Sequence, residues 1–467
     1  MNFKFFTAAA KYDTINNVYR RGAPPAGGRA FACFFGGIFL ATFGKGVHPK
    51  DCKALSAEMP IGVLPDPQKV WLPLSQHIGK PARPVVEAGE HVLRGQLVAR
   101  KAEGVSANIY SPVAGIVKGV VGHITASGKK RDHILIENDF TDESTSLAPL
   151  DSPSEESILS RIEEAGIVGM GGAGFPTHIK FNAGGKADVL VVNAAECEPY
   201  ITCDYRILKE YAEEFLRGVR YCMLACGAKT AVIGIEKNKP DAISLLSSLC
   251  KEGDISVCAL RTRYPQGAEK QLIYSCTGRV VPEGGLPVAA GAVVSNVHTV
   301  LSVCRAVEKG TPCYERVMTV SGKCVKTPSN LWVKNGTPLR EIAAYCGADE
   351  NCARIVSGGP MMGEAVFSLK VCASKTTSSL LFLDKTECED KRASVCIGCG
   401  RCVQACPMGL SPTFIEDALF RKDYEEAKRY GASSCIACGC CSYVCPAKRF
   451  LTQSVRLAKK IIAERKI

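Results

Sequence analysis

The chain has 467 residues, of which 46% are hydrophobic and 22% are charged, and its formal net charge is +12. This composition is ordinary for a folded chain of several domains and excludes a disordered or fibrous protein. Because no aromatic-rich basic stretch or nucleic-acid motif accompanies the positive charge, we expect no nucleic-acid partner.

Residues 1–45 are an N-terminal extension whose structure the sequence leaves open. Within it, residues 30–43 read AFACFFGGIFLATF and follow several arginines, a layout that superficially matches a secretory signal. The apolar run is too short to span a bilayer. We therefore expect an irregular extension rather than a membrane anchor.

Residues 46–141 are rich in Val, Ile, Gly and Pro in short alternating runs, which predicts a small all-β domain. The runs EAGEHVLRGQLV and SPVAGIVKGV resemble the barrel-sandwich fold of lipoyl and biotinyl carrier domains. Those carriers need a modifiable lysine at a hairpin tip, whereas Lys118 lies in an alternating strand pattern. We therefore expect a structural role for Lys118. The acidic, proline-broken residues 142–156 that follow are expected to be a linker.

The middle of the chain changes to a mixed pattern. In residues 157–312, apolar β-branched runs alternate with helical stretches, which predicts a parallel sheet covered by helices. Residues 313–367 contain short strand patterns around one amphipathic segment, and we expect a β-grasp domain similar to the SLBB domain. Residues 368–390 are expected to be a second linker.

The C-terminal part combines cysteine motifs with helical patterns. Residues 391–450 hold two such motifs, separated by a segment whose apolar residues recur at helical spacing. Residues 451–467 form a basic amphipathic tail, whose apolar face we expect to pack on its own protein. The predicted fold class is therefore a multidomain α/β protein with a C-terminal helical domain of the two-cluster ferredoxin kind.

The cysteine motifs are the strongest chemical signal. Each has the spacing C-x-x-C-x-x-C-x-x-x-C-P, which is typical of proteins that bind two 4Fe–4S clusters and in which the fourth cysteine ligates the other cluster. Zinc also binds paired C-x-x-C motifs, but eight ligands with both prolines favour clusters. Cys440 is out of register, and we expect it not to be a ligand. The first cluster is assigned Cys396, Cys399, Cys402 and Cys445, and the second Cys435, Cys438, Cys441 and Cys406.

A glycine-rich segment is the second signal. Residues 169–176 read GMGGAGFP and precede a predicted helix start. Glycines at this density let backbone amides approach a phosphate or flavin closely, and a helix N-terminus adds a positive dipole. A tight structural turn is the alternative, because the spacing of an ordinary dinucleotide-binding turn is met only loosely.

Four segments together resemble the flavin and NADH site of the 51-kDa subunit of respiratory complex I. They occur in the same order and read GMGGAGFPTHIK, NAAECEPY, YPQGAE and SNVHT. The resemblance implies that Gly169, Gly171, Gly172, Gly174 and Lys180 hold FMN and nucleotide, that Asn193, Glu196 and Asn296 face the flavin, and that Phe175, Glu198, Tyr264, Gly267 and Glu269 approach the nicotinamide nucleotide.

The chain departs from that family at a few positions in these segments. Met170 stands where the family has an arginine, Ala268 where it has an acid, and Ser295 where it has an amide. These departures weaken the expected NADH contact more than the FMN contact. His178 and His298 also lie in the segments, and we expect solvated or packing roles for both.

The order of the modules resembles the RnfC family, the C subunits of Rnf complexes, across about residues 46–455. The near-match GKGVHPK at residues 44–50 departs by a lysine from that family's glycine pair. The resemblance implies a peripheral subunit on the cytoplasmic face of the bacterial cell membrane, within an ion-translocating ferredoxin:NAD oxidoreductase. Such a subunit passes electrons between NAD(H), FMN and two 4Fe–4S clusters. Its expected partners are the other Rnf membrane subunits and, indirectly, ferredoxin.

Two other functions remain open from the sequence. One is a soluble flavin and iron–sulfur cobalamin reductase, in which the carrier-like β module is expected after the flavin domain rather than before it. The other is a cluster-bearing relay whose flavin site has decayed. Absence of bound flavin would favour this relay.

Overall fold

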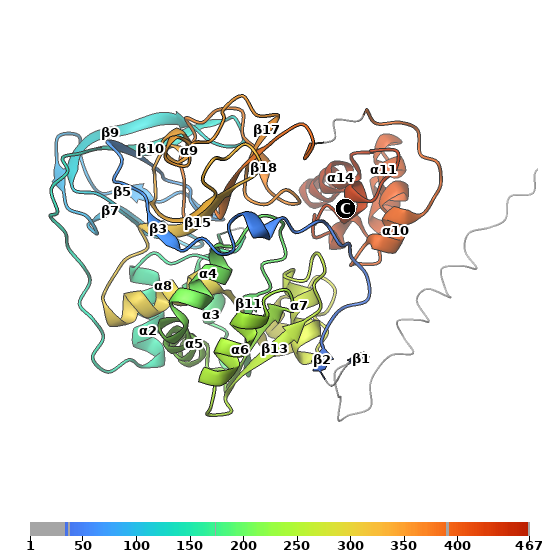
Figure 1. Ribbon diagram of the computed structural model, residues 1–467, viewed down its shortest axis with the longest axis horizontal. Helices are drawn as coiled ribbons and strands as arrows, with labels where there is room; N and C mark the ends of the chain where they lie inside the picture. The colour runs from blue at the N-terminus through green and yellow to red at the C-terminus, as the bar shows by residue number, and fades with distance from the viewer. Residues whose placement is uncertain (1–32, 36–37, 173, 389–391, 466–467) are drawn as a thin grey trace, which may run out of the picture.

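The computed structural model describes residues 33–35, 38–172, 174–388 and 392–465 (Figure 1). Most of the expected N-terminal extension, residues 1–32, lies outside the described residues. The β, α/β, β-grasp and helical parts follow one another along the chain, as the sequence patterns predict. Among the described residues, no helix combines the length and the apolar character needed to cross a membrane.

The first large unit is all-β. One sheet has the strand order β4-β10-β9-β6, and a smaller sheet has the order β5-β7-β8. Lys118 lies within β9, where its Nζ is 2.6 Å from Glu137 Oε2, so the lysine is part of a strand and not of a hairpin tip. The strands are β4 (Lys69–Pro73), β5 (Arg83–Pro84), β6 (His91–Val92), β7 (Leu97–Arg100), β8 (Ile109–Tyr110), β9 (Gly115–Ile124) and β10 (Lys130–Asn138).

The second unit is a parallel sheet with helices on its faces, in the order β13-β12-β11-β14. Strands β11, β12 and β14 are mostly apolar and buried, as expected where helices cover both faces, whereas the edge strand β13 is only partly buried. Strands β11 and β14 are neighbours in this sheet and run parallel. Their carboxyl ends therefore carry the NAAECEPY and SNVHT segments to the same edge of the sheet. The elements are α2 (Glu155–Glu164), α3 (Thr177–Phe181), β11 (Val189–Ala194), α4 (Cys203–Glu210), α5 (Ala212–Cys226), β12 (Thr230–Glu236), α6 (Pro240–Leu249), β13 (Ile255–Leu260), α7 (Glu269–Thr277), η2 (Pro287–Ala290), β14 (Ala292–Asn296) and α8 (Val297–Glu308).

The third unit is a mixed sheet with the order β18-β17-β19-β15-β16-β3. The prediction that residues 368–390 are a linker is wrong, because β19 is fully buried and lies between β15 and β17. Strand β3 comes from the segment assigned to the first domain and pairs with β16. The elements are β3 (Ile61–Val63), β15 (Glu315–Ser321), β16 (Ser329–Lys334), α9 (Leu339–Tyr345), β17 (Arg354–Ser357), β18 (Glu364–Ala365) and β19 (Ser379–Leu383).

The C-terminal unit is helical. Helix α14 packs on α11 and α12, and buries Leu451, Val455, Ala458 and Ile462 on one face, so the described part of the basic tail docks on its own protein. The elements are α10 (Arg401–Ala405), α11 (Pro412–Phe420), α12 (Tyr424–Arg429), η3 (Ala432–Ser434), α13 (Cys440–Tyr443) and α14 (Leu451–Arg465).

An N-terminal strap, which we define as residues 41–56, crosses the surface between these units (Figure 1). It follows β1 (Cys33–Phe35) and β2 (Ile38–Leu40) and includes η1 (Lys53–Leu55). Ala41 forms a parallel bridge with Leu260, and Val47 an antiparallel bridge with Tyr264. The strap is therefore built into the edge of the α/β unit.

Candidate functional site

The first set of cysteines lines one pocket in the helical unit. Cys396, Cys399 and Cys402 come from the first motif, and Cys445 is the last cysteine of the second motif. Cys396 and Cys399 are exposed, whereas Cys402 and Cys445 are buried. The chain thus brings together the four cysteines that the sequence assigns to the first cluster.

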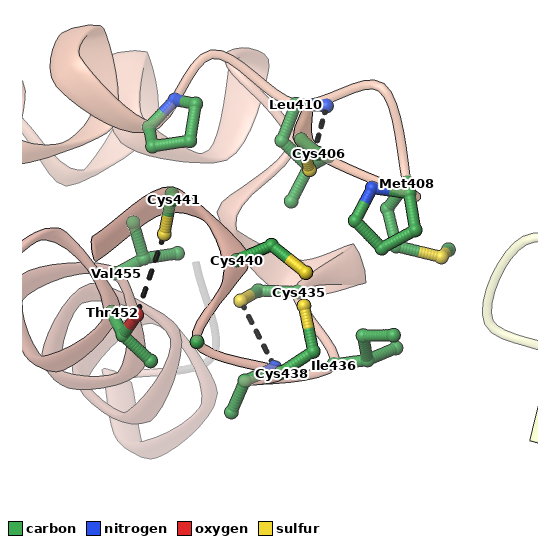
Figure 2. A pocket seen from close by; sticks show the side chains of 14 residues that line it. Cys406, Met408, Leu410, Cys435, Ile436, Cys438, Cys440, Cys441, Thr452 and Val455 are labelled. Carbon is green, nitrogen blue, oxygen red and sulfur yellow. Dashed lines mark hydrogen bonds between the residues drawn. The ribbon is translucent and has the colours of Figure 1, made fainter. Parts of the chain in front are cut away.

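The second set lines a separate pocket, shown in Figure 2. Cys435, Cys438 and Cys441 meet Cys406 of the first motif there. Backbone amides point at two of the sulfurs: Leu410 N lies 3.4 Å from Cys406 Sγ, and Ala437 N lies 3.3 Å from Cys435 Sγ.

These two pockets fit two 4Fe–4S clusters. Each contains the four thiols of one predicted ligand set, three from one motif and one from the other. Amide N–H groups that donate to ligand sulfurs stabilise the negative charge of such a cluster and tune its potential.

The second pocket also holds a fifth cysteine, Cys440 (Figure 2). Eight of the nine cysteines within residues 396–445 are predicted ligands, and Cys440 is the ninth. It is fully buried, and its Sγ lies 3.9 Å from the backbone carbonyl oxygen of Tyr264. The same sulfur points toward the sulfurs of Cys435 and Cys438 (Figure 2). Cys440 therefore lies at the junction of the two units and beside the ligand set, and its role as a non-ligand stays a prediction.

We expect Cys440→Ser to keep the full iron content, because a hydroxyl can replace the thiol as a donor to the Tyr264 carbonyl. Cys438→Ser should instead lose about four irons per chain. Iron analysis and electron paramagnetic resonance spectra of the reduced proteins measure both. Loss of iron from Cys440→Ser would make Cys440 a ligand.

The glycine-rich loop connects α2 to α3. The backbone amide of Gly169 donates to the Phe175 carbonyl oxygen at 2.9 Å, which closes the loop. A Cβ at Gly171 would lie 3.0 Å from the Asn296 side chain, whereas a Cβ at Gly172 would meet no atom within 4 Å. Gly172 therefore faces open space beside Gly171, as a loop that cradles a planar or phosphate-bearing ligand requires.

Gly174 has a different environment. Its φ is +68°, and a Cβ there would lie 2.9 Å from Thr376 Cγ2 and 3.1 Å from the Gln76 carbonyl oxygen. The end of the loop is thus packed against the β-rich units. Phe175 follows it with 36% of its surface exposed.

Several polar side chains gather where the strands of the parallel sheet reach their carboxyl ends. Asn193 Nδ2 donates to the Gly267 carbonyl oxygen at 2.8 Å. Asn296 caps α8 with its Oδ1 and donates from Nδ2 to Asp204 Oδ2 at 2.6 Å. The Asp204 amide in turn donates to Glu196 Oε1 at 2.7 Å. The three residues expected to face a flavin, Asn193, Glu196 and Asn296, therefore lie at one edge of the sheet. Asp204 lies with them, although the sequence motifs did not single it out.

Asp204 is a buried carboxyl group beside another one. Burial, with the Glu196 carboxylate as a second cause, raises its pKa to about 7, and the Asn296 amide works in the opposite direction. The second oxygen of the Glu196 carboxylate, Oε2, is buried and has no hydrogen-bond partner among the described residues. This edge can therefore accept hydrogen bonds from a polar ligand.

Asp204→Asn should flatten the pH dependence of stability between about pH 4 and pH 7. Over this range the unfolded chain releases the Asp204 proton while the folded chain keeps it, so the free energy of unfolding falls as the pH rises. The expected contribution is on the order of 4 kcal/mol at its full extent. Urea unfolding of the FMN-free wild type and variant at pH 5 and pH 8 measures it, and parallel profiles would contradict the raised pKa.

Lys180 and Glu269 form an ion pair at the open side of the loop. Lys180 Nζ lies 2.6 Å from Glu269 Oε1, and both side chains are partly exposed, which limits the strength of the pair. Lys180 can therefore turn to an anionic ligand at small cost.

Glu198 and Tyr264 connect this edge to the second cysteine pocket. The Glu198 carboxyl is buried, which raises its pKa to about 7, and it accepts a hydrogen bond from the Met361 amide at 3.0 Å. The Tyr264 hydroxyl donates to the Cys438 carbonyl oxygen at 2.8 Å and lies 3.4 Å from Glu198 Oε1. Tyr264, one of the residues expected to approach nucleotide, thus packs directly on the loop that carries the second cysteine set, and Glu198 lies beside it.

The residues that depart from the 51-kDa pattern are mostly internal. Met170 is buried in the core, and its amide donates to Thr299 Oγ1 at 3.0 Å. The Ser295 hydroxyl is buried without a hydrogen-bond partner. His298 packs edge-on against Trp332 with ring centroids 5.5 Å apart, which agrees with the packing role expected for it.

Comparison with known proteins matches four families in order along the chain. They are the RnfC barrel sandwich hybrid domain (residues 41–141), the Nuo51 FMN-binding domain (162–305), the SLBB domain (317–365) and the 4Fe-4S dicluster domain (390–446). The chain is 45% identical to the C subunit of the proton-translocating ferredoxin:NAD(+) oxidoreductase complex of Clostridium ljungdahlii, over 90% of this chain and 94% of that one. The chain belongs to the RnfC family.

Other RnfC relatives are similar over comparable lengths. The C subunit of the Na(+)-translocating ferredoxin:NAD(+) oxidoreductase complex of Acetobacterium woodii is 40% identical over 91% of this chain and 98% of that one. The C subunit of the ion-translocating oxidoreductase complex of Rhodobacter capsulatus is 41% identical over 90% of this chain and 83% of that one. As a member of the RnfC family, the chain has an FMN-binding domain and a 4Fe–4S dicluster domain, which confirms the cofactor classes expected from its motifs.

Proposed function

We propose that the chain is the peripheral electron-transfer subunit of a membrane-bound, ion-translocating ferredoxin:NAD oxidoreductase complex and reacts with NAD(H) on the cytoplasmic face. The contact of Tyr264 with Cys438 supports this proposal most directly, since it joins the flavin unit to a cysteine pocket within one chain. The relatives in Clostridium ljungdahlii and Acetobacterium woodii carry the corresponding activity in their names.

The proposed roles of the site residues follow from their positions. When bound, FMN converts the two-electron hydride of NADH into single electrons, which 4Fe–4S clusters carry. Gly171, Gly172 and Lys180 would hold the flavin and nucleotide phosphates, and Asn193, Glu196 and Asn296 would hydrogen-bond the flavin. Glu198 and Glu269, with the partly exposed Phe175, would bind the nicotinamide nucleotide, whereas Tyr264, which is 2% exposed, would join this site to the second cysteine set.

The two cysteine sets have different proposed surroundings. The set of Cys406, Cys435, Cys438 and Cys441 is in contact with the flavin unit through Tyr264. The other set lies at the surface, where Val395 and Ile397 are 82% and 69% exposed. We therefore assign this exposed face to the contact with the membrane subunits of the complex.

Reconstitution tests the proposed function. Membranes that contain the other Rnf subunits but lack their C subunit should regain ferredoxin-dependent reduction of NAD when the purified chain is added. A chain that binds these membranes without restoring the activity would contradict the role in NAD(H) reaction. A chain that does not bind them would contradict the partner assignment.

A further inference from the structure

The strap carries a buried lysine that reaches the flavin site from outside the flavin domain. Lys53 begins η1 and has only 8% of its surface exposed. It lies more than a hundred residues before the FMN-binding domain, which spans residues 162–305. A buried ammonium group must be compensated by hydrogen bonds and opposite charge, so its partners indicate what it does.

The partners of Lys53 all belong to the NAAECEPY segment and the residue that follows it. Its Nζ donates to the Glu198 carbonyl oxygen at 3.0 Å and to the Ile201 carbonyl oxygen. It also lies 3.9 Å from Glu196 Oε2, the buried oxygen that has no hydrogen-bond partner. One cation thus ties the middle of this segment to its end and offsets the charge of Glu196.

The segment needs such support because its backbone is strained. Glu196 and Tyr200 have φ values of +44° and +68°, in the left-handed region that residues with a side chain rarely adopt. Residues in this region persist only where surrounding contacts hold them. The strap supplies further contacts, since the Tyr200 amide donates to the Asp51 carbonyl oxygen at 2.7 Å, and Ser56 Oγ lies 2.8 Å from Thr202 Oγ1.

A second buried lysine contacts the same segment but from within the flavin domain. Lys239 Nζ donates to the Ala195 carbonyl oxygen at 2.8 Å. Glu236 lies nearby and accepts a hydrogen bond from the Arg263 amide at 3.1 Å. Lys239 therefore holds the start of the segment, whereas the contacts to Glu198 and Ile201 come from Lys53.

We propose that Lys53 is a positioning residue of the flavin site: it holds residues 196–201 in their binding geometry and neutralises Glu196. The flavin site is thus completed by a segment outside the flavin domain. This inference rests on the proposed function, because it concerns the residues that would face FMN.

The test compares Lys53→Met with Lys53→Arg in the full chain, with Lys50→Met as the matched control. Lys50 is an exposed lysine of the same strap, so its replacement removes an equal charge without touching the segment. FMN is added to the flavin-free proteins, and the dissociation constant is measured by quenching of flavin fluorescence. The flavin midpoint potential, the iron content and the cluster spectra are recorded alongside.

Lys53→Met should weaken FMN binding by about tenfold or more, since it removes charge-assisted hydrogen bonds. It should also shift the flavin potential while leaving iron content and cluster spectra unchanged. Lys53→Arg should recover part of the affinity, and Lys50→Met should match wild type. If Lys53→Met does not fold, Lys53→Gln keeps a hydrogen-bond donor without the charge and should show the same shift in potential.

Failure of the role of Lys53 and failure of the proposed function give different results. Lys53→Met or Lys53→Gln with the affinity and flavin potential of wild type would overturn the role of Lys53 alone. A wild-type chain with its iron but without FMN binding would contradict the proposed function and this inference with it.

Discussion

Replacement of Cys445 by alanine will remove the cluster of the first motif and leave that of the second. Cys445 belongs to the second motif by sequence, but it lines the pocket of Cys396, Cys399 and Cys402. A three-thiol site does not hold a complete 4Fe–4S cluster firmly, so about four of about eight irons should be lost. The remaining spectrum should match that of Cys396→Ala and differ from that of Cys435→Ala.

The reciprocal change tests the same arrangement from the other side. Cys406→Ala should remove the second cluster, because Cys406 lines the pocket of Cys435, Cys438 and Cys441. Cys346→Ala is the control, since Cys346 is a fully buried cysteine in the β-grasp core and should keep both clusters. If Cys445→Ala instead gave the spectrum of Cys435→Ala, the crossed assignment would be wrong.

Gly172→Val should lower the affinity for FMN by about 100-fold without reducing the stability of the flavin-free chain. Apart from its neighbours in the chain, a Cβ at Gly172 meets no atom of the described residues within 4 Å, and the backbone there needs no positive φ. The flavin-free chain should therefore accommodate a valine at this position. The bound flavin would occupy that space, and a side chain forced into an occupied site is strongly unfavourable. Fluorescence titration with FMN measures the affinity, and thermal unfolding of the flavin-free protein measures the stability.

Gly122→Val is the matched control for this experiment. Gly122 is an exposed glycine of β9 that also has no atom within 4 Å of its Cβ position. This variant should bind FMN as wild type does. Equal affinities for Gly172→Val and wild type would place the flavin elsewhere and contradict the role of the glycine loop.

The parts of the molecule that local sequence determines were predictable. Cysteine spacing predicts a domain with two 4Fe–4S clusters, and the match to the 4Fe-4S dicluster domain confirms this class of domain. The apolar runs at residues 188–195 and 229–236 predict parallel strands because such strands are apolar on both faces, and these runs contain β11 and β12. The RnfC family, which the resemblance of the module order implies, and the α/β fold class were both confirmed.

The parts of the molecule that depend on contacts distant in sequence could not be predicted from local patterns. Residues 368–390 were expected to be a linker, yet they contain β19, which pairs with strands on both sides. Asp204 lies in α4, beyond the recognised segment, and reaches the site because α4 packs on α8, the helix that Asn296 caps. Lys53 is separated by 145 residues from Glu198, whose carbonyl it binds, so no local pattern could indicate the contact.

The central claim is that one chain links NAD(H) to iron–sulfur clusters through a flavin site. The most direct measurement is an anaerobic titration of the purified chain with NADH, followed by absorbance and with flavin and iron content known. The account predicts that NADH bleaches both flavin and cluster absorbance. A chain with about eight irons, no flavin and no response to NADH would contradict it and leave a cluster relay.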